Sequence, residues 1–345
     1  MNNWKKFLQK DKSKKYILIA AATFCVVAAF LSIALGTASL TFSQLLKAIR
    51  EGAGSGFEGN IFWYVRLPRT IACLLAGAGL SVSGAVIQGV LANKLASPGI
   101  IGVNAGAGFA VTFCCALGAV SSITISGWAV AGSAFFGAFL AMMLVVFMAE
   151  QTGASRRTVI LAGIAVNSFL NAGSEAIVML IPELAIVSAD FRVGGFTSVT
   201  IQRLIPAGSL IVAALIINLT LCNELDIMNL GEETAQGLGL SVKKMRNIFL
   251  ILAAILAGAS VSFAGLLGFA GLIVPHMGRK LVGGEHRNLL PFCALFGAGF
   301  VTVCDLFARL IFRPYELPVG ILMSFIGGPF FIFLLIGKKG VRGHD

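Results

Sequence analysis

Long apolar runs recur along this chain of 345 residues, and they constrain its fold more than any other feature. A run of about 18 or more apolar residues is long enough to cross a hydrocarbon core about 30 Å thick as a helix. Hydrophobic residues make up 57% of the sequence and charged residues only 12%, about half the charged fraction of a soluble domain. The sequence therefore predicts an all-α polytopic membrane protein. It lacks the short alternating segments that are typical of a β-barrel.

About ten transmembrane helices are predicted, in one transmembrane domain that covers residues 1–345. Only Gly265, Gly268 and Gly271 indicate where the apolar stretch 246–283 breaks, so nine or eleven spans also fit. The predicted spans are 16–36, 62–90, 98–120, 127–149, 158–181, 204–222, 246–264, 266–283, 289–311 and 318–337.

Basic residues are distributed unevenly over the predicted connections. With ten spans, 18 of the 26 lysines and arginines fall on the side that holds both termini, including a basic leader at 1–15. Cytoplasmic connections are enriched in Lys and Arg, so both termini are predicted to be cytoplasmic. The net charge of +11 reflects this topology, and no nucleic-acid partner is expected. The first apolar run is longer than the core of a cleaved signal peptide, which favours a retained first helix.

Two decapeptides resemble each other. LAGAGLSVSG (75–84) and LAGASVSFAG (256–265) share six of ten positions and lie in spans of opposite predicted direction. This is the pattern of an inverted repeat, which is common in transporters. Chance similarity between two glycine- and alanine-rich helices is the alternative. A nearby polar pair, Ser81 and Gln88, lies on one helix face with Gly84 between them, and close helix packing around Gly84 explains it best.

A polar stripe crosses the fifth predicted span. Asn167, Asn171 and Glu175 are spaced by four residues, so they lie on one face of a helix. Polar groups are costly in hydrocarbon and usually have partners or a water path. The stripe is interpreted as the lining of a translocation path. The alternative is a set of hydrogen bonds between helices, with Glu175 buried and protonated.

Arginines stand where predicted helices begin or end on the outer side. Arg66 and Arg69 flank Pro68, and Arg309 lies four residues after Asp305, with which it could pair. The simplest interpretation is anchoring at the membrane interface by long side chains. The functional alternative is a set of fixed positive sites for acidic groups of an external partner.

The segment 223–246 is a polar island in this apolar chain, with four acidic and three basic residues. It is predicted to form a cytoplasmic loop with a short helix at about 230–238. Asn229 suits the N-cap position, with Glu232 three residues later as in a capping box, and Gly237 or Gly239 can end the helix.

Such a helix could dock a soluble partner, or it could lie on the membrane surface. Two adjacent glutamates fit an anionic leaflet poorly, which favours docking. The chain contains no G-x-x-x-x-G-K-[ST] phosphate loop, so it is not expected to hydrolyse ATP or to be an enzyme. A secondary transporter that uses Glu175 as an ion carrier, and a non-transporting scaffold, remain alternatives at this point.

Several long motifs, in order from about residue 60 to the C-terminus, resemble the FecCD-type permeases. These are the membrane subunits of ABC importers for iron–siderophores, haem and vitamin B12. The motifs are RLPRTIACLLAGAGLSVSGAVIQGVLANKLASPGIIGVNAGAG (66–108), LAGIAVNSF (161–169), LGEETAQGLG (230–239), GFAGLIVPHMGRKLVGGEHRNLLP (268–291) and ELPVGILMSFIGGPFFIFLL (316–335).

The resemblance implies the fold of a type II ABC importer permease with ten helices, located in the cell membrane. It also implies a second permease subunit, the same or a paralogous chain. Two cytoplasmic ATP-binding subunits and an external substrate-binding protein complete the assembly. This chain would hold no cofactor, because ATP and Mg belong to the ATPase. The segment that matches LGEETAQGLG would be the coupling helix, which sits in a groove of the ATPase. The positions carried over are Gly231, Glu232, Glu233, Ala235 and Gly239.

For other sites the resemblance implies roles by position. Arg66, Arg69 and Arg309 match positions that receive acidic residues of the binding protein, and the stripe on the fifth helix would line the path. In the family a tryptophan often precedes the segment that matches FRVGGFTS (191–198), whereas Phe191 and Arg192 stand there in this chain. Iron–siderophore is the expected substrate because such systems dominate the family, with haem and cobalamin as alternatives.

Overall fold

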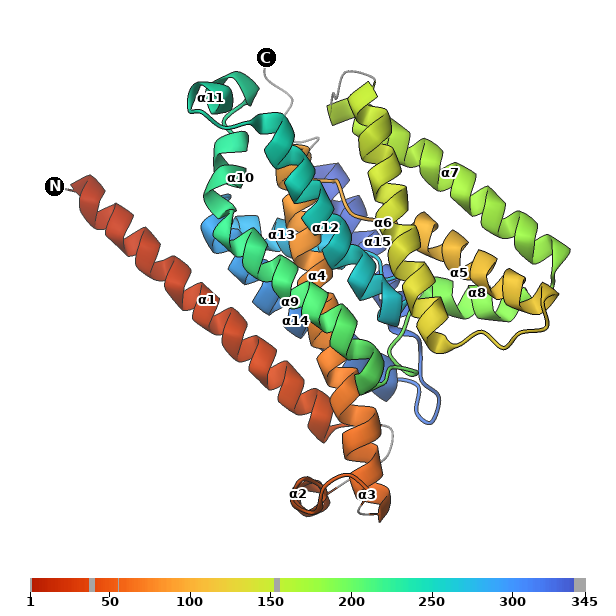
Figure 1. Ribbon diagram of the computed structural model, residues 1–345. Helices are drawn as coiled ribbons and strands as arrows, with labels where there is room; N and C mark the ends of the chain where they lie inside the picture. Colours follow the sequence, from red (N-terminus) through yellow and green to blue (C-terminus); the bar gives the residue numbers. More distant parts are fainter. Residues whose placement is uncertain (1, 37–40, 55, 152–155, 338–345) are drawn as a thin grey trace.

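The structure, a computed structural model, describes residues 2–36, 41–54, 56–151 and 156–337. Every regular element in this part of the chain is a helix (Figure 1). Eight helical segments are long and apolar enough to cross a membrane, which confirms an all-α polytopic membrane protein. They are α1 (Asn2–Ala34), the continuous run of α3 (Gly56–Asn60), η1 (Ile61–Arg66) and α4 (Leu67–Val90), α5 (Val103–Val120), α6 (Gly127–Gln151), α7 (Arg156–Leu180), α9 (Ile201–Thr220), α12 (Val242–Ala264) and α14 (His286–Leu310).

The other two predicted spans also hold helices, α13 (Ala270–Leu281) and α15 (Val319–Gly337). With 12 residues, α13 is about 18 Å long, too short to cross the hydrocarbon core alone. The prediction that 266–283 is a full span is therefore wrong in length. The break falls at Gly265, which ends α12 with a φ of +68°. A Cβ at Gly265 would lie 2.7 Å from the carbonyl oxygen of Phe191, so only glycine fits there without strain.

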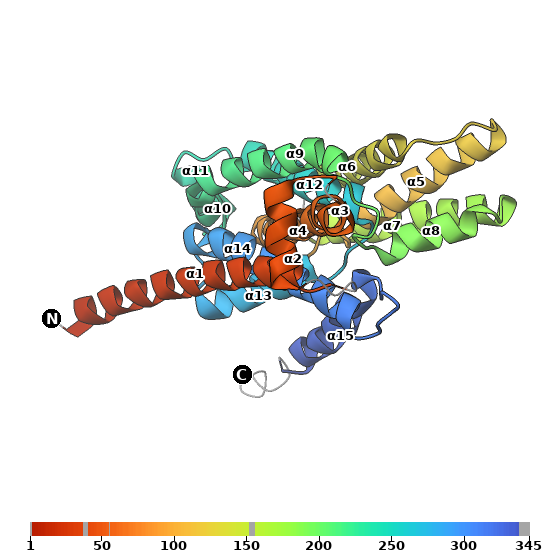
Figure 2. The same ribbon diagram turned by 90° about the horizontal axis from the view of Figure 1, so that it is seen from below.

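Helix α4 occupies the centre of the bundle, with α12, α13 and α14 packed around it (Figures 1 and 2). Almost all its residues from Pro68 to Val90 are buried. A Cβ at Gly84 would overlap the carbonyl oxygen of Gly271 on α13, and one at Gly77 would overlap that of Gly297 on α14. The predicted close packing around Gly84 is confirmed, since small residues let these backbones touch.

The two similar decapeptides lie in α4 and α12, which pack against each other. Gly79 and Ser260 hold the fifth position of each decapeptide, and a Cβ at Gly79 would lie 2.5 Å from Ser260 Oγ. The Ser83 hydroxyl donates to the carbonyl of Ala253 at 2.8 Å. One pair of equivalent positions, Gly79 and Ser260, therefore meets where the helices cross.

Several short helices lie outside the predicted spans. Helix α2 (Phe42–Glu51) starts at Thr41, which forms a capping box with Gln44, and α8 (Leu184–Val193) follows α7. Figure 1 shows α2 and α3 beyond one end of the bundle and α11 (Glu232–Gly237) beyond the opposite end. We call these the α2 end and the α11 end. Of the predicted basic leader, residue 1 and the side chains of 2–12 lie outside the described part, as does the basic flank at 338–345.

Candidate functional site

The polar island 223–246 holds two short helices at the α11 end, α10 (Cys222–Met228) and α11. The predicted N-cap is wrong. Asn229 ends α10 instead, and its Nδ2 donates to the carbonyl of Leu225 at 3.0 Å. The residue that precedes α11 is Gly231, whose φ of +110° suits a residue without a Cβ. Glu232 makes no capping box here. Its carboxylate lies 3.4 Å from the guanidinium of Arg246.

The C-terminal end of α11 is closed by a Schellman motif. Gly239 has a φ of +83°, its N–H donates to the carbonyl of Gln236 at 2.9 Å, and Leu240 N–H donates to that of Ala235 at 3.0 Å. Ala235 is buried, whereas the side chains of Leu230 and Leu238 are 62% and 63% exposed. Ala235 therefore packs the segment against the rest of the chain, and Leu230 and Leu238 are exposed.

An ion-pair network lies at the α2 end. Arg69 donates from Nε and Nη2 to both carboxylate oxygens of Asp305, at 2.9 to 3.2 Å, and from Nη1 to Glu316 at 2.6 Å. Asp305 is only 1% exposed. The predicted pair of Asp305 with Arg309 is present, with 3.0 Å between Arg309 Nε and Asp305 Oδ2. The buried carboxylate of Asp305 therefore forms ion pairs with two guanidinium groups.

The three arginines expected to meet an external partner are all buried in this structure. Arg66 donates to the carbonyls of Ile33 and Ala34, at 2.6 and 2.8 Å. Arg309 donates to the hydroxyl of Ser32 at 2.8 Å. These bonds tie η1 and α14 to the end of α1. The guanidinium groups of Arg66 and Arg309 are therefore bonded to internal acceptors.

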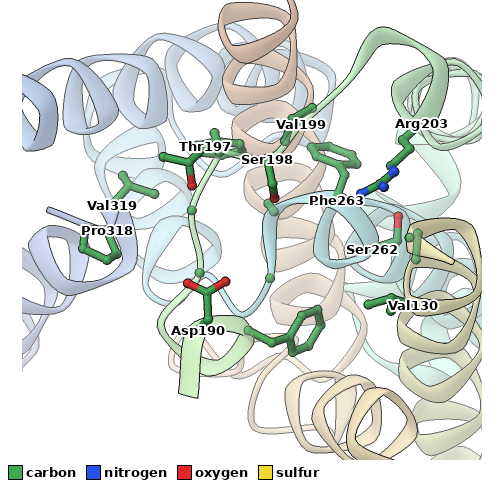
Figure 3. A pocket seen from close by; sticks show the side chains of 18 of the residues that line it. Val130, Asp190, Thr197, Ser198, Val199, Arg203, Ser262, Phe263, Pro318 and Val319 are labelled. Atoms are coloured by element: carbon green, nitrogen blue, oxygen red, sulfur yellow. The ribbon is translucent and has the colours of Figure 1, made fainter. Parts of the chain in front are cut away.

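A cavity of about 370 Å³ opens at the α2 end, between α6, α8, α9, α12 and the segment before α15 (Figure 3). In Figure 3 the carboxylate of Asp190 points into the cavity from α8, and the guanidinium of Arg203 lies beside the hydroxyl of Ser262. Arg69 and Glu316 also line it. Charges of both signs and hydroxyl groups make this cavity suited to polar molecules.

The structure separates the members of the polar stripe on α7. The amide of Asn167 donates to the carbonyls of Gly99 and Ile100, both at 3.0 Å. Asn171 and Glu175 lie on the exposed face of α7, and the side chain of Glu175 is 70% exposed, 3.9 Å from Arg192. Glu175 is therefore not buried between helices of this chain, which contradicts that part of the alternative interpretation, whereas Asn167 does bond to another segment.

Three polar residues of the α2 end were not predicted from the sequence. Asp190, Arg203 and Glu316 come from the end of one helix, the start of another and a connecting segment. No local spacing indicates them, because they are brought together only by the packing of distant helices. For Arg203 and Glu316, a position next to a predicted span end was the one available signal.

Residues 24–337 match the FecCD transport family. The chain is 36% identical over 341 residues to the iron(3+)-hydroxamate import system permease protein FhuG of Bacillus subtilis, covering 95% of this chain and 99% of that protein. It is 33% identical over 322 residues to the hemin transport system permease protein HmuU of Yersinia pestis, covering 92% and 94%. A solved metal-chelate type ABC transporter in an inward-facing conformation has a TM-score of 0.82, with 28% identity, over 94% of this chain and 99% of that one.

Proposed function

Because the chain belongs to the FecCD transport family, we propose that it is the permease subunit of an ABC importer that moves a ferric siderophore into the cytoplasm. ATP hydrolysis on partner subunits drives the movement, and the iron chelate is the cargo. The names of two relatives, an iron(3+)-hydroxamate permease and a hemin permease, support iron chelates as the substrate class.

The observation that carries this proposal is helix α11, which is exposed and ends in a Schellman motif. Leu230 and Leu238, which flank α11, are exposed, and a docked partner would remove their apolar surface from water. We assign Gly231, Glu232, Glu233, Ala235 and Gly239 to the coupling segment that docks a cytoplasmic ATPase. The glycines permit the backbone at each end, and Ala235 fixes the helix to the permease. In this assignment the α11 end and both termini face the cytoplasm.

The translocation path lies between two permease subunits in this proposal. The exposed side chains of Asn171 and Glu175 then face the path, and Asn167 holds α7 against the loop at 99–100. An external binding protein docks at the α2 end, over the cavity of Figure 3.

Because the three arginines are buried, a binding protein could reach them only by replacing their internal partners. Acidic residues of the binding protein would compete with Asp305 and Glu316 for Arg69, and with Ser32 for Arg309; Arg66 would exchange its bonds to backbone carbonyls in the same way. Weaker binding-protein affinity in Arg309→Gln than in Arg50→Gln, an exposed arginine of α2, would support this exchange. Equal affinities in two folded variants would contradict it.

The test of the function is reconstitution. The permease is co-expressed with its neighbouring ATPase and any second permease, and the complex is placed in liposomes with its binding protein. Ferric siderophore, haem or cobalamin is then supplied in turn. ATP hydrolysis and uptake stimulated by a loaded ferric siderophore are the expected result. Uptake of haem or cobalamin alone would overturn the substrate, and failure of the subunits to co-purify would overturn the importer assignment.

The coupling segment is tested with a charge reversal. Glu232→Lys together with Glu233→Lys should abolish uptake while the permease remains folded, because both carboxylates are exposed. Glu51→Lys, a reversal of an exposed acid at the α2 end, is the matched control. Normal uptake by the double variant would count against docking through α11.

A further inference from the structure

A short contact joins α10 to the start of α14. The Asp226 carboxylate accepts the backbone N–H of His286, with its two oxygens at 3.0 and 3.1 Å, and one of these oxygens lies 2.6 Å from Nδ1 of the His286 ring. Sixty residues separate the two in the sequence. Asp226 thus satisfies a free amide in the first turn of α14 from a different helix.

The His286 ring is 2% exposed, and its environment fixes how it bonds. Its Nε2 is buried, with no hydrogen-bond partner in the described part of the chain. A Cβ at Gly89 of α4 would lie 2.9 Å from this nitrogen, so the ring packs directly on the α4 backbone. A buried N–H without an acceptor is costly. The hydrogen-bond pattern therefore assigns the proton to Nδ1, which donates to Asp226.

Helix α14 links this contact to the opposite end of the molecule. Its 25 residues extend about 37 Å. Asp305 and Arg309 stand near its last turn, and Asp305 binds Arg69, which also binds Glu316 at the cavity of the α2 end. One continuous helix is therefore joined by polar contacts to α10 at its first residue and to the cavity wall at its far end.

We propose that the Asp226–His286 contact is the joint through which the coupling segment moves α14. The inference rests on the proposed function, because it takes α11 as the helix that the ATPase displaces. Only three residues, 229–231, separate α10 from α11, so displacement of α11 pulls on α10. Asp226 transmits the pull to α14, because a short contact from a half-buried carboxylate to two N–H groups resists separation. Asp226 and His286 are positioning residues for coupling, and neither touches the cargo.

The joint predicts a specific order of substitutions at one position. In His286→Asn, the amide nitrogen replaces Nδ1 at the same distance from the backbone and can donate to Asp226. In His286→Gln, the amide nitrogen instead takes the place of Nε2, next to Gly89. The described part of the chain offers no acceptor to Nε2 there. His286→Ala removes the ring donor altogether. A residue that only filled space would be replaced better by the larger glutamine.

The experiment uses the complete complex in liposomes with its binding protein. Ferric hydroxamate, ferric citrate and haem are supplied separately, and uptake per ATP hydrolysed is measured with the one that the wild-type complex accumulates. We expect His286→Ala, His286→Gln and Asp226→Asn to lower this ratio about tenfold, the size of effect expected from losing a hydrogen bond to a charged group. His286→Asn should stay within about twofold of the wild type. Glu285→Gln, at the adjacent exposed position, should leave the ratio unchanged.

Assembly separates the failure of this inference from that of the proposed function. Each variant is first tested for co-purification with the ATPase and for its apparent Tm. If the variants assemble and transport with the wild-type ratio, or if glutamine rescues as well as asparagine, the joint is overturned while the importer assignment stands. If the wild-type permease itself binds no ATPase or accumulates none of the three chelates, the proposed function is overturned and the joint with it.

Discussion

Arg69 and Asp305 form a buried, two-pronged ion pair, with Arg69 Nη2 and Nε at 2.9 and 3.1 Å from the Asp305 oxygens, although 236 residues separate them. The pair joins the start of the central helix α4 to the last turns of α14. Each partner also has a second contact, Arg69 with Glu316 and Asp305 with Arg309. The α2 end of the bundle is therefore held by an ion-pair network whose central pair, Arg69 and Asp305, is buried.

Asp305→Asn is expected to destabilise the protein by about 3–5 kcal/mol, because it leaves Arg69 and Arg309 buried with less counter-charge. The apparent Tm of the purified permease in detergent measures this. The exposed pair of Lys47 and Glu51 provides the control, and Glu51→Gln should cost less than about 1 kcal/mol. Similar losses in both variants would show that burial of the network adds nothing.

Gly84→Ala is expected to destabilise the protein by about 1–3 kcal/mol through overpacking, because its Cβ would overlap the backbone of Gly271. Gly132→Ala on α6 is the matched control. A Cβ there meets nothing within 4 Å, and alanine favours the helix by about 1 kcal/mol. The apparent Tm in detergent should therefore fall in Gly84→Ala and rise in Gly132→Ala. A neutral Gly84→Ala would mean that α13 can shift away from α4 at little cost.

The polar stripe on α7 should divide into two roles. Asn167→Leu loses its bonds to the carbonyls of Gly99 and Ile100 and should cost about 1–3 kcal/mol of stability. Glu175→Leu should leave the apparent Tm unchanged, because this side chain is exposed, and should reduce uptake in proteoliposomes if it lines the path. Uptake at the wild-type rate in Glu175→Leu would remove it from the path.

Two substitutions in the polar island should have opposite outcomes. Leu238→Asp should preserve the fold and lower co-purification with the ATPase, because this leucine is exposed and a docking groove would have to desolvate the new charge. Ala235→Asp should weaken α11 itself, because Ala235 is buried. Circular dichroism and co-purification distinguish the two. Full ATPase retention by Leu238→Asp would place the docking surface elsewhere.

The ammonium of Lys14 donates to Glu285 at 2.6 Å and lowers the pKa of this carboxyl below its ordinary value. Because the folded-state pKa is the lower one, the pair stabilises the protein fully above the unfolded pKa of about 4.3. Its contribution is lost as the pH falls through the folded-state pKa. The Tm difference between wild type and Glu285→Gln should be small and constant near neutral pH, and should vanish in this acidic range. A difference that grows on acidification would contradict the assignment.

The apolar runs predicted the eight long spans, because a run of apolar residues carries that information locally; α13 is shorter than the span predicted for it. The sequence also located the break at Gly265 and the pair of Asp305 with Arg309, which are set by a backbone requirement and by helical spacing. The wrong N-cap at Asn229 has a clear cause. Asn229 matched the local pattern, but α10 extends to Met228, so Asn229 ends that helix instead of starting the next.

The rest of the candidate site depends on packing between segments far apart in the chain. Glu316 is a partner of Arg69 across 247 residues, and His286 meets Asp226 across 60. The burial of Arg66 also has no local signal, because it results from the end of α1 folding over the start of α4. Spacing rules act within one element, so they could not indicate these contacts.

The central position of α4 has a consequence for biosynthesis. Its segment has a mean hydropathy of 1.9, enough for insertion as a transmembrane helix, yet 83% of that window is buried by protein in the finished fold. The helices that cover it, α12, α13 and α14, are synthesised more than 150 residues later. At about 5–20 residues per second, α4 must wait for about 10–30 s before they arrive. Its apolar composition therefore stabilises α4 in the lipid during insertion, and its glycines allow the later helices to pack closely against it.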